Sequence, residues 1–158
     1  WGRLDREQML PKPPVCQGCP MYQDGQGFVP DEVIEGSEVF VLGQNPGFDE
    51  EHEGKPFVGL TGQAMVARYF PEADLERGVN VSLGNVLRCR WNHGNDLPPE
   101  KVLGPAIKHC MEAHFRPPST TRLIVAQGAL AWRAMGQSTK VTEWRGFLAP
   151  SPDDRLPF

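Results

Sequence analysis

The chain has 158 residues, of which 39% are hydrophobic and 23% are charged, in proportions typical of a globular domain with a buried core. No apolar run is long enough to span a membrane, and the N-terminus lacks the charged-then-apolar pattern of a signal peptide. The formal net charge of −4 disfavours a protein that coats nucleic acid with a uniformly basic surface, but it allows a basic patch on one face.

The sequence predicts a single domain over residues 1–158. Because the chain begins at Trp1 rather than Met, we expect it to be a fragment or a processed form. Residues 1–36 are rich in Pro, Gly and polar residues, which break long elements. They predict an arm built of loops, which must be cross-linked to the rest of the protein to be stable.

Beyond the arm, segments with strand and helix patterns alternate. An apolar run at residues 39–42 predicts a core strand, and residues 43–47 predict a tight loop. Residues 61–70 have the apolar spacing of a helix, with Thr61 as its N-cap. The later segments predict a strand at 79–83, a helix from Pro98 toward His114, a strand at 123–126, a helix at 129–135 and a strand at 141–144. Pro105 predicts an irregular or delayed start of the helix toward His114.

This alternation is typical of an α/β fold. We expect a three-layer α/β/α arrangement around a central, mostly parallel four-stranded sheet. In such sheets ligands bind at the carboxyl ends of the strands. Residues 43–45 and 84–85 follow the first two predicted strands, so a ligand site is expected there.

Four cysteines indicate a metal site. Cys16 and Cys19 form a C-x-x-C followed by Pro20, whereas Cys89 and Cys110 come much later. Nothing in the sequence suggests secretion, which disfavours a disulfide framework. A zinc ribbon usually pairs two C-x-x-C knuckles, and the second pair here is too widely spaced, which favours an iron–sulfur cluster over zinc. Inert buried thiols beside a chance C-x-x-C are the remaining alternative.

Five short motifs resemble those of the uracil-DNA glycosylase superfamily. They are C-x-x-C-P at residues 16–20, GQNPGFDE at 43–50, GKPFVGLTGQ at 54–63, NVLRCR at 85–90 and IVAQGALAWRAMG at 124–136. The PFVG-x-x-G-Q stretch is similar to the iron–sulfur branch called family 4, and glycosylase-like domains of phage-type DNA polymerases are similar too. The resemblance implies a DNA-repair enzyme that flips uracil out of DNA and excises it by hydrolysis of the N-glycosidic bond.

The resemblance also implies a cofactor. Cys16, Cys19, Cys89 and Cys110 would hold a [4Fe-4S] cluster, with zinc as the alternative occupant. The expected role is structural, because hydrolysis of a glycosidic bond needs no electrons. The cluster would tie the arm to the segment between Cys89 and Cys110.

Four residues of the base pocket follow from the resemblance. Asn45 would position the water that attacks the sugar, and the backbone amide of Gln44 would contact a uracil carbonyl. Phe57 would stack on the flipped base. The Asn85 carboxamide would accept from N3–H while donating to O4, a pattern that rejects cytosine. Gln44 stands where family 4 more often has an acidic residue, which puts its role in doubt.

DNA binding is expected at a helix start, where free backbone amides of Thr61, Gly62 and Gln63 would hold a phosphate. Four basic residues would add positive charge, although each also suits a solvated surface: Lys55, Arg68, Arg88 and Arg90. An acidic run predicts a solvated loop: Asp49, Glu50, Glu51 and Glu53.

The superfamily places a His-Pro-Ser/Ala motif late in the chain. None of the four histidines lies in such a motif: His52, His93, His109 and His114. Ala149-Pro150-Ser151 lacks the imidazole, so we expect the motif to lie beyond Phe158.

DNA is the expected partner, together with a DNA polymerase or replication proteins. We expect a monomer without membrane contact, in the cytoplasm of a bacterial, archaeal or phage-infected cell. The main alternative is a non-catalytic DNA-binding module of the same fold, attached to a phage-type DNA polymerase. A third alternative, a metal-sensing or redox protein, leaves PFVG and Asn85 unexplained.

Overall fold

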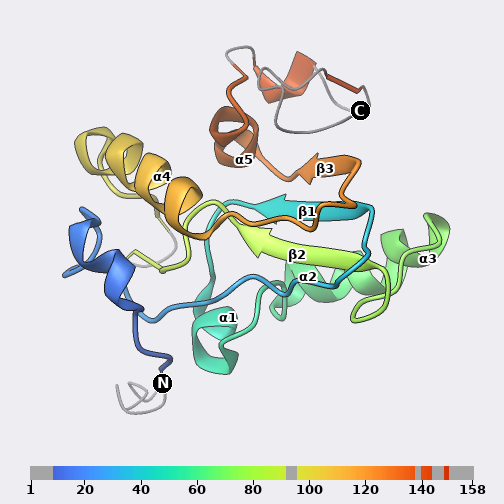
Figure 1. Cartoon of the computed structure of the whole chain (residues 1–158), viewed down its shortest axis with the longest axis horizontal. Helices are drawn as coiled ribbons and strands as arrows, with labels where there is room; N and C mark the ends of the chain where they lie inside the picture. Colours follow the sequence, from blue (N-terminus) through green and yellow to red (C-terminus); the bar gives the residue numbers. More distant parts are fainter. Residues whose placement is uncertain (1–8, 92–95, 138–139, 144–147, 150–158) are drawn as a thin grey trace.

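The structure, a computed structural model, describes residues 9–91, 96–137, 140–143 and 148–149. Three parallel strands form one sheet in the order β2-β1-β3, with bounds β1 (Val39–Gly43), β2 (Val81–Asn85) and β3 (Leu123–Ala126). Val39 pairs with Val81 on one side and Leu123 on the other. The carboxyl ends of all three strands therefore lie at the same edge of the sheet (Figure 1).

Helices cover both faces of the sheet, because side chains of β1 alternate between two hydrophobic cores. Phe40 and Leu42 pack with residues of α4 (Glu100–His114) and α5 (Ala129–Ala134). Val41 belongs to a second core that contains Met65 and Phe70. Figure 1 shows α4 and α5 on one side of the strands and α1 (Phe48–Glu53), α2 (Leu60–Ala64) and α3 (Phe70–Glu72) on the other. The expected α/β/α layering is confirmed.

The predicted helix at residues 61–70 is confirmed in place but not at its start. It begins at Leu60, and Gly59 rather than Thr61 is the N-cap. A π-helical stretch at Met65–Tyr69 joins α2 to α3. The cap lies at Gly59 because its carbonyl accepts the first helical hydrogen bond, from the Gln63 amide at 2.9 Å.

Two strand predictions differ from the structure. The second strand runs over Val81–Asn85 rather than 79–83, and Val79 lies before it with 58% of its surface exposed. The fourth strand, expected at 141–144, is wrong within the described residues. Val141–Glu143 form a 3-10 turn closed by the Glu143 amide on the Lys140 carbonyl, and Trp144 lies outside the described residues.

The later helices lie where the sequence pattern predicts them, but the irregular or delayed start expected from Pro105 is wrong. Helix α4 runs unbroken from Glu100 to His114 with Pro105 inside it. Pro105 is exposed, so the carbonyl that loses its helical partner lies on the solvent side. Within the described residues, no helix has the length and apolar character needed to cross a membrane.

The described part of the arm is loop-built, as expected, and contains one 3-10 turn at Pro14–Gly18. Backbone bridges dock it along β2 and the residues that follow, joining Glu32 to Leu83 and Gln26 to Arg90. Figure 1 shows the turn beside α4, far along the chain. The arm is therefore held against both the sheet and α4.

Candidate functional site

A cleft of about 570 Å³ opens at the carboxyl ends of the three strands. Its walls come from the loop after β1, the PFVG segment, the start of α2 and the ends of β2 and β3. The four residues predicted for the base pocket all line it: Gln44, Asn45, Phe57 and Asn85. Of the three residues predicted to bind DNA, Thr61 and Gly62 line the cleft and Gln63 does not. Gln127 also lines it, from the end of β3, and was not singled out by the sequence because Gln after a strand carries no specific signal.

The floor of the cleft is formed where Phe57 and Asn85 meet over Gly43. A methyl group on Gly43 would lie 2.5 Å from Asn85 Oδ1 and 2.7 Å from Phe57 Cζ. Both distances are far below van der Waals contact, so only glycine fits at the end of β1. Phe57 has a φ of 54°, which is rare for a residue other than glycine.

Asn85 presents an unused polar group in this cleft. The residue is only 5% exposed, and its backbone amide donates to the Asp31 carboxylate. Among the described residues, no hydrogen bond uses its side-chain carboxamide. Because Asn85 lines the cleft, this carboxamide is available to a ligand there.

Gln44 and Asn45 differ in what their side chains do. Asn45 Nδ2 donates to the Pro46 carbonyl at 3.1 Å, and within the described residues Asn45 Oδ1 accepts no hydrogen bond. Gln44 Oε1 accepts from the Leu130 amide at 3.3 Å, at the start of α5. The Gln44 side chain therefore packs against α5, and only Asn45 has a free side-chain oxygen.

The acidic run is not the solvated loop that was expected. It forms α1, in which Glu50 and Glu51 make specific bonds. Glu50 Oε2 accepts from the Gly47 amide at 3.0 Å, and Oε1 accepts from the Val58 and Gly59 amides at 3.1 and 2.9 Å. The Gly-x-x-Glu spacing of a capping box was the signal available in the sequence.

Arg88 and Arg90 are not DNA-facing surface charges, which corrects the prediction made for them. The Arg88 side chain is 1% exposed and pairs with Asp31 at 2.7 Å, and Arg90 pairs with the buried Glu51. Both arginines follow β2, where the arm and α1 cover the chain. Burial raises the pKa of the Asp31 carboxyl, and Arg88 opposes that rise.

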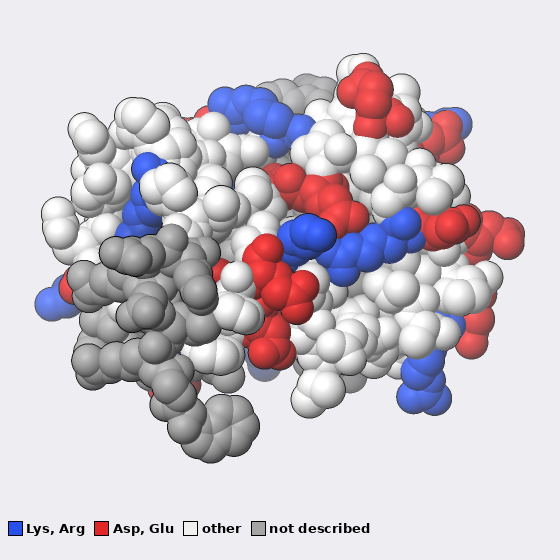
Figure 2. All heavy atoms as spheres, turned by 90° about the horizontal axis from the view of Figure 1, so that it is seen from below, with Lys and Arg blue, Asp and Glu red and all other residues white. Residues whose placement is uncertain are grey.

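Charges alternate on the face that carries α1 and α2. Figure 2, seen from below Figure 1, shows Asp and Glu side chains gathered between Lys and Arg rather than a continuous basic surface. Lys55 and Arg68 are exposed, as expected. Any DNA contact on this face therefore needs local donors rather than a general positive field.

The start of α2 offers such donors at Thr61 and Gly62. Gly62 is buried, and a methyl group there would lie 2.0 Å from the Phe57 carbonyl oxygen, so glycine lets the helix pass the PFVG backbone. The Gln63 amide donates to the Gly59 carbonyl and its side chain donates to the Val58 carbonyl at 2.8 Å. Gln63 thus holds the loop and has no free amide for a phosphate.

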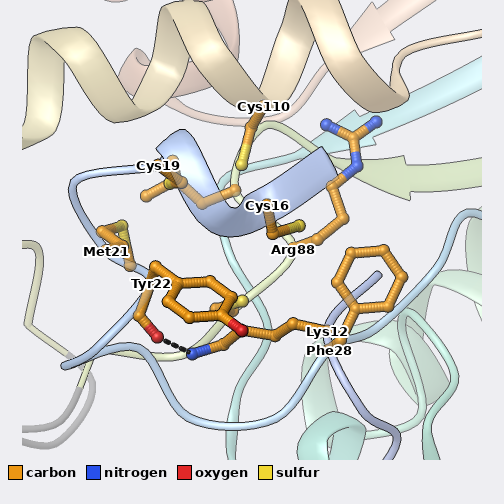
Figure 3. A pocket seen from close by; sticks show the side chains of 10 residues that line it. Lys12, Cys16, Cys19, Met21, Tyr22, Phe28, Arg88 and Cys110 are labelled. Carbon is orange, nitrogen blue, oxygen red and sulfur yellow. Dashed lines mark hydrogen bonds between the residues drawn. The ribbon is translucent and has the colours of Figure 1, made fainter. Parts of the chain in front are cut away.

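All four cysteines line one cavity, and Figure 3 shows Cys16, Cys19 and Cys110 around it. They come from three segments: Cys16 and Cys19 from the arm, Cys89 from the chain after β2 and Cys110 from α4. All four are free thiols. In the described part of the chain, no three His, Cys, Asp or Glu side chains form a ready single-ion site.

The surroundings of these thiols include the Lys12 ammonium and shift their pKa values. Lys12 lines the cavity and donates to the Tyr22 and Gly25 carbonyls at 2.6 and 2.5 Å (Figure 3). A hydrogen bond with Cys110 lowers the pKa of the Cys19 thiol to about 6. Burial raises the pKa of the Cys89 thiol to about 12. The Cys19 thiol therefore loses its proton more readily than the Cys89 thiol, for which a bound cation would favour the thiolate.

Two histidines of α4 connect that helix to the arm. His109 Nε2 lies 3.0 Å from the Val15 carbonyl oxygen, and His114 Nε2 lies 3.1 Å from Cys16 Sγ. Desolvation lowers the pKa of His114 to about 4. His93 lies outside the described residues, and no described histidine lines the cleft.

Comparison with known proteins points to one family. Residues 30–156 match the family described as Uracil DNA glycosylase superfamily. The chain is 33% identical over 87 residues to the type-4 uracil-DNA glycosylase of Archaeoglobus fulgidus and 31% identical over 88 residues to that of Saccharolobus solfataricus. These alignments cover 55% and 56% of this chain, but only 43% and 40% of the archaeal proteins. A longer alignment, with the type-4 uracil-DNA glycosylase of Thermotoga maritima, is 28% identical over 133 residues and covers 83% of this chain and 67% of that protein.

Proposed function

The chain belongs to the uracil-DNA glycosylase superfamily, and we propose that it acts in DNA base-excision repair by removing uracil. The observation that carries the proposal is the carboxamide of Asn85 beside the Phe57 ring, in the cleft at the strand ends. A flat base with one donor and one acceptor on its edge satisfies both groups at once.

Asn85 selects the base. Its carbonyl oxygen accepts from uracil N3–H and its amino group donates to O4, whereas cytosine presents an acceptor at N3 and a donor at C4. Phe57 stacks on the base, and Gly43 leaves room for both side chains. The backbone amide of Gln44 donates to a uracil carbonyl. The Gln44 side chain packs against α5 and is therefore not the group that contacts the base.

Asn45 positions the water for hydrolysis. Its amino group donates to the Pro46 carbonyl, so Oδ1 is left to accept a hydrogen bond from the attacking water. The water oxygen bonds to C1′ of the sugar, the N-glycosidic bond breaks, and its electron pair leaves on uracil N1. A water proton passes to solvent, and the Asn85 amino group stabilises the negative charge that develops on uracil O4.

DNA is the proposed partner of the start of α2. The amides of Thr61 and Gly62 hold a phosphate near the flipped nucleotide, with Gln63 bracing the loop. We propose that a single domain carries out this activity as a monomer in the cytoplasm. A DNA polymerase or other replication proteins are the further partners that we propose.

The cysteine cavity is proposed to hold a [4Fe-4S] cluster, with zinc as the alternative. Four thiols from three segments line one cavity beside the Lys12 ammonium, which would offset the negative charge of thiolates, and this supports the proposal. The cluster would supply a covalent tie between segments and no chemistry for bond cleavage. Cys16 and Cys19 would then fasten the arm to Cys89 and Cys110.

A non-catalytic DNA-binding module of the same fold, as attached to phage-type DNA polymerases, is the second candidate. One observation favours it: among the described residues, the cleft has no histidine. Such a module keeps the base pocket and the phosphate contacts but has no histidine beside Asn85 to help stabilise the departing base.

Single-turnover assays separate the two candidates. The chain, extended past Phe158 so that it includes the expected His-Pro motif, is mixed in excess with oligonucleotides that carry one uracil, cytosine or thymine. Alkali-labile abasic sites are then counted over time. We expect abasic sites only at uracil. Binding of the uracil oligonucleotide without abasic sites would reject the enzyme and support the binding module.

A further inference from the structure

We propose that Glu50 and Arg77 are positioning residues that clamp the backbone on either side of Phe57 and so aim its ring at the base. This inference rests on the proposed function, because it gives these two residues a role in binding uracil. Glu50 lines the cleft, but both of its carboxylate oxygens already accept from backbone amides, and Arg77 does not line the cleft. Both residues therefore act through Phe57.

Phe57 needs such a clamp because its backbone is strained. Its φ of 54° lies in the left-handed region, which L side chains rarely adopt. In the described part of the chain, Asp74 is the only other residue besides glycine with a positive φ. Residues keep such conformations only where their surroundings enforce them.

Arg77 holds the peptide groups at and before the ring. Its Nη1 donates to the Phe57 carbonyl at 2.9 Å, and its Nη2 donates to the Pro56 carbonyl at 2.7 Å. The guanidinium is itself fixed by Glu32 of the arm, whose carboxylate accepts from Nε at 3.2 Å and from Nη2 at 2.7 Å. Arg77 therefore fixes two successive carbonyls with a planar, preorganised donor.

Glu50 holds the peptide groups after the ring. Its Oε1 accepts from the Val58 amide at 3.1 Å and the Gly59 amide at 2.9 Å. Its Oε2 accepts from the Gly47 amide in the loop after β1. One carboxylate thus links the loop that carries Asn45 to the segment that carries Phe57.

The signs of the two charges match the backbone that they hold. A cation meets the carbonyls before and at Phe57, and an anion meets the amides after it. Charge-assisted hydrogen bonds are stronger than neutral ones, and four of them flank a single strained residue. The result is a ring held against Gly43 and Asn85 before any base arrives.

Glu50→Gln and Arg77→Lys test the clamp. Gln offers one acceptor oxygen instead of two, and Lys cannot span two carbonyls and Glu32 together. Two matched controls change exposed residues outside the cleft: Glu53→Gln on the same helix, and Arg122→Lys, which is 68% exposed in a surface pair with Glu38. Free-uracil affinity is measured for each variant, with and without Phe57→Ala.

We expect each clamp variant to weaken uracil binding about tenfold, and to do so less than about twofold when Phe57→Ala is already present. The controls should stay at the wild-type affinity in both backgrounds. Equal losses with and without the Phe57 ring, or no loss at all, would overturn the inference. The double comparison excludes a general loss of folding, which would lower affinity in both backgrounds.

A second readout does not depend on uracil. With 4-fluorophenylalanine at position 57, the fluorine resonance of the free protein should shift and broaden in Glu50→Gln and stay unchanged in Glu53→Gln. An unchanged resonance in Glu50→Gln would reject the clamp. If the wild-type protein binds no uracil but the resonance still responds, the clamp stands and the proposed function falls.

Discussion

Replacing Gly43 by Ala adds one methyl group at the point where the Phe57 ring and the Asn85 carboxamide meet. That methyl group would lie 2.5 Å from Asn85 Oδ1 and 2.7 Å from Phe57 Cζ. Carbon atoms pack best at roughly 3.5–4.0 Å, so both side chains must retreat by about 1 Å. The strand itself cannot move away, because Gly43 pairs with Asn85 in the sheet.

The size of the effect follows from that displacement. Overpacking a closed site costs about 1–3 kcal/mol, and a misplacement of about 1 Å in a catalytic site costs on the order of a hundredfold in rate. We therefore expect Gly43→Ala to reduce uracil release about a hundredfold and uracil affinity by about tenfold or more. The free energy of unfolding should fall by no more than about 3 kcal/mol.

Gly104→Ala is the matched control. A methyl group at Gly104 would meet its nearest atom at 3.6 Å, an ordinary contact, and Ala favours the helix that contains it. Single-turnover release, uracil affinity and thermal unfolding are compared for both variants. Normal uracil affinity in a folded Gly43→Ala protein would refute the packing of Phe57 and Asn85 over Gly43.

Three further predictions test other parts of the site. Asn85→Asp should abolish uracil affinity with little change in melting temperature, because a carboxylate accepts from N3–H but cannot donate to O4; equal affinity in calorimetry would remove Asn85 from the pocket. Asn45→Ala should slow single-turnover release of uracil on the order of a hundredfold, while DNA with an abasic site still binds normally. An equally large loss of binding to that DNA would contradict the proposal that Asn45 only positions the water. Cys89→Ala should lower the iron content and speed proteolysis before Gly36, since the arm loses its tie to the segment after β2; an unchanged iron content would exclude Cys89 as a ligand.

Elements defined by local pattern were predictable from the sequence. The apolar runs at β1 and β3 and the spacing of α4 lie where expected, because each depends on its own residues. The convergence of Phe57 and Asn85 was predictable only through the family resemblance, since 28 positions separate them. No local sequence pattern indicates that both side chains reach Gly43.

Buried charges were not predictable, because their partners lie far along the chain. Arg88 pairs with Asp31 across 57 positions, and Arg90 pairs with Glu51 across 39. In sequence each arginine is indistinguishable from a solvated one. Glu50 was missed for a different reason: its run of acidic neighbours concealed the capping spacing from Gly47.

The most direct test of the central claim observes Asn85 itself during base binding. The protein is labelled with nitrogen-15, the side-chain amide of Asn85 is assigned by its loss in Asn85→Asp, and uracil or cytosine is added. We predict that the Asn85 amide resonance shifts on saturation with uracil and stays in place with cytosine. Binding of uracil without a shift of this resonance, or an equal shift with cytosine, would contradict the assignment of the cleft as a uracil pocket.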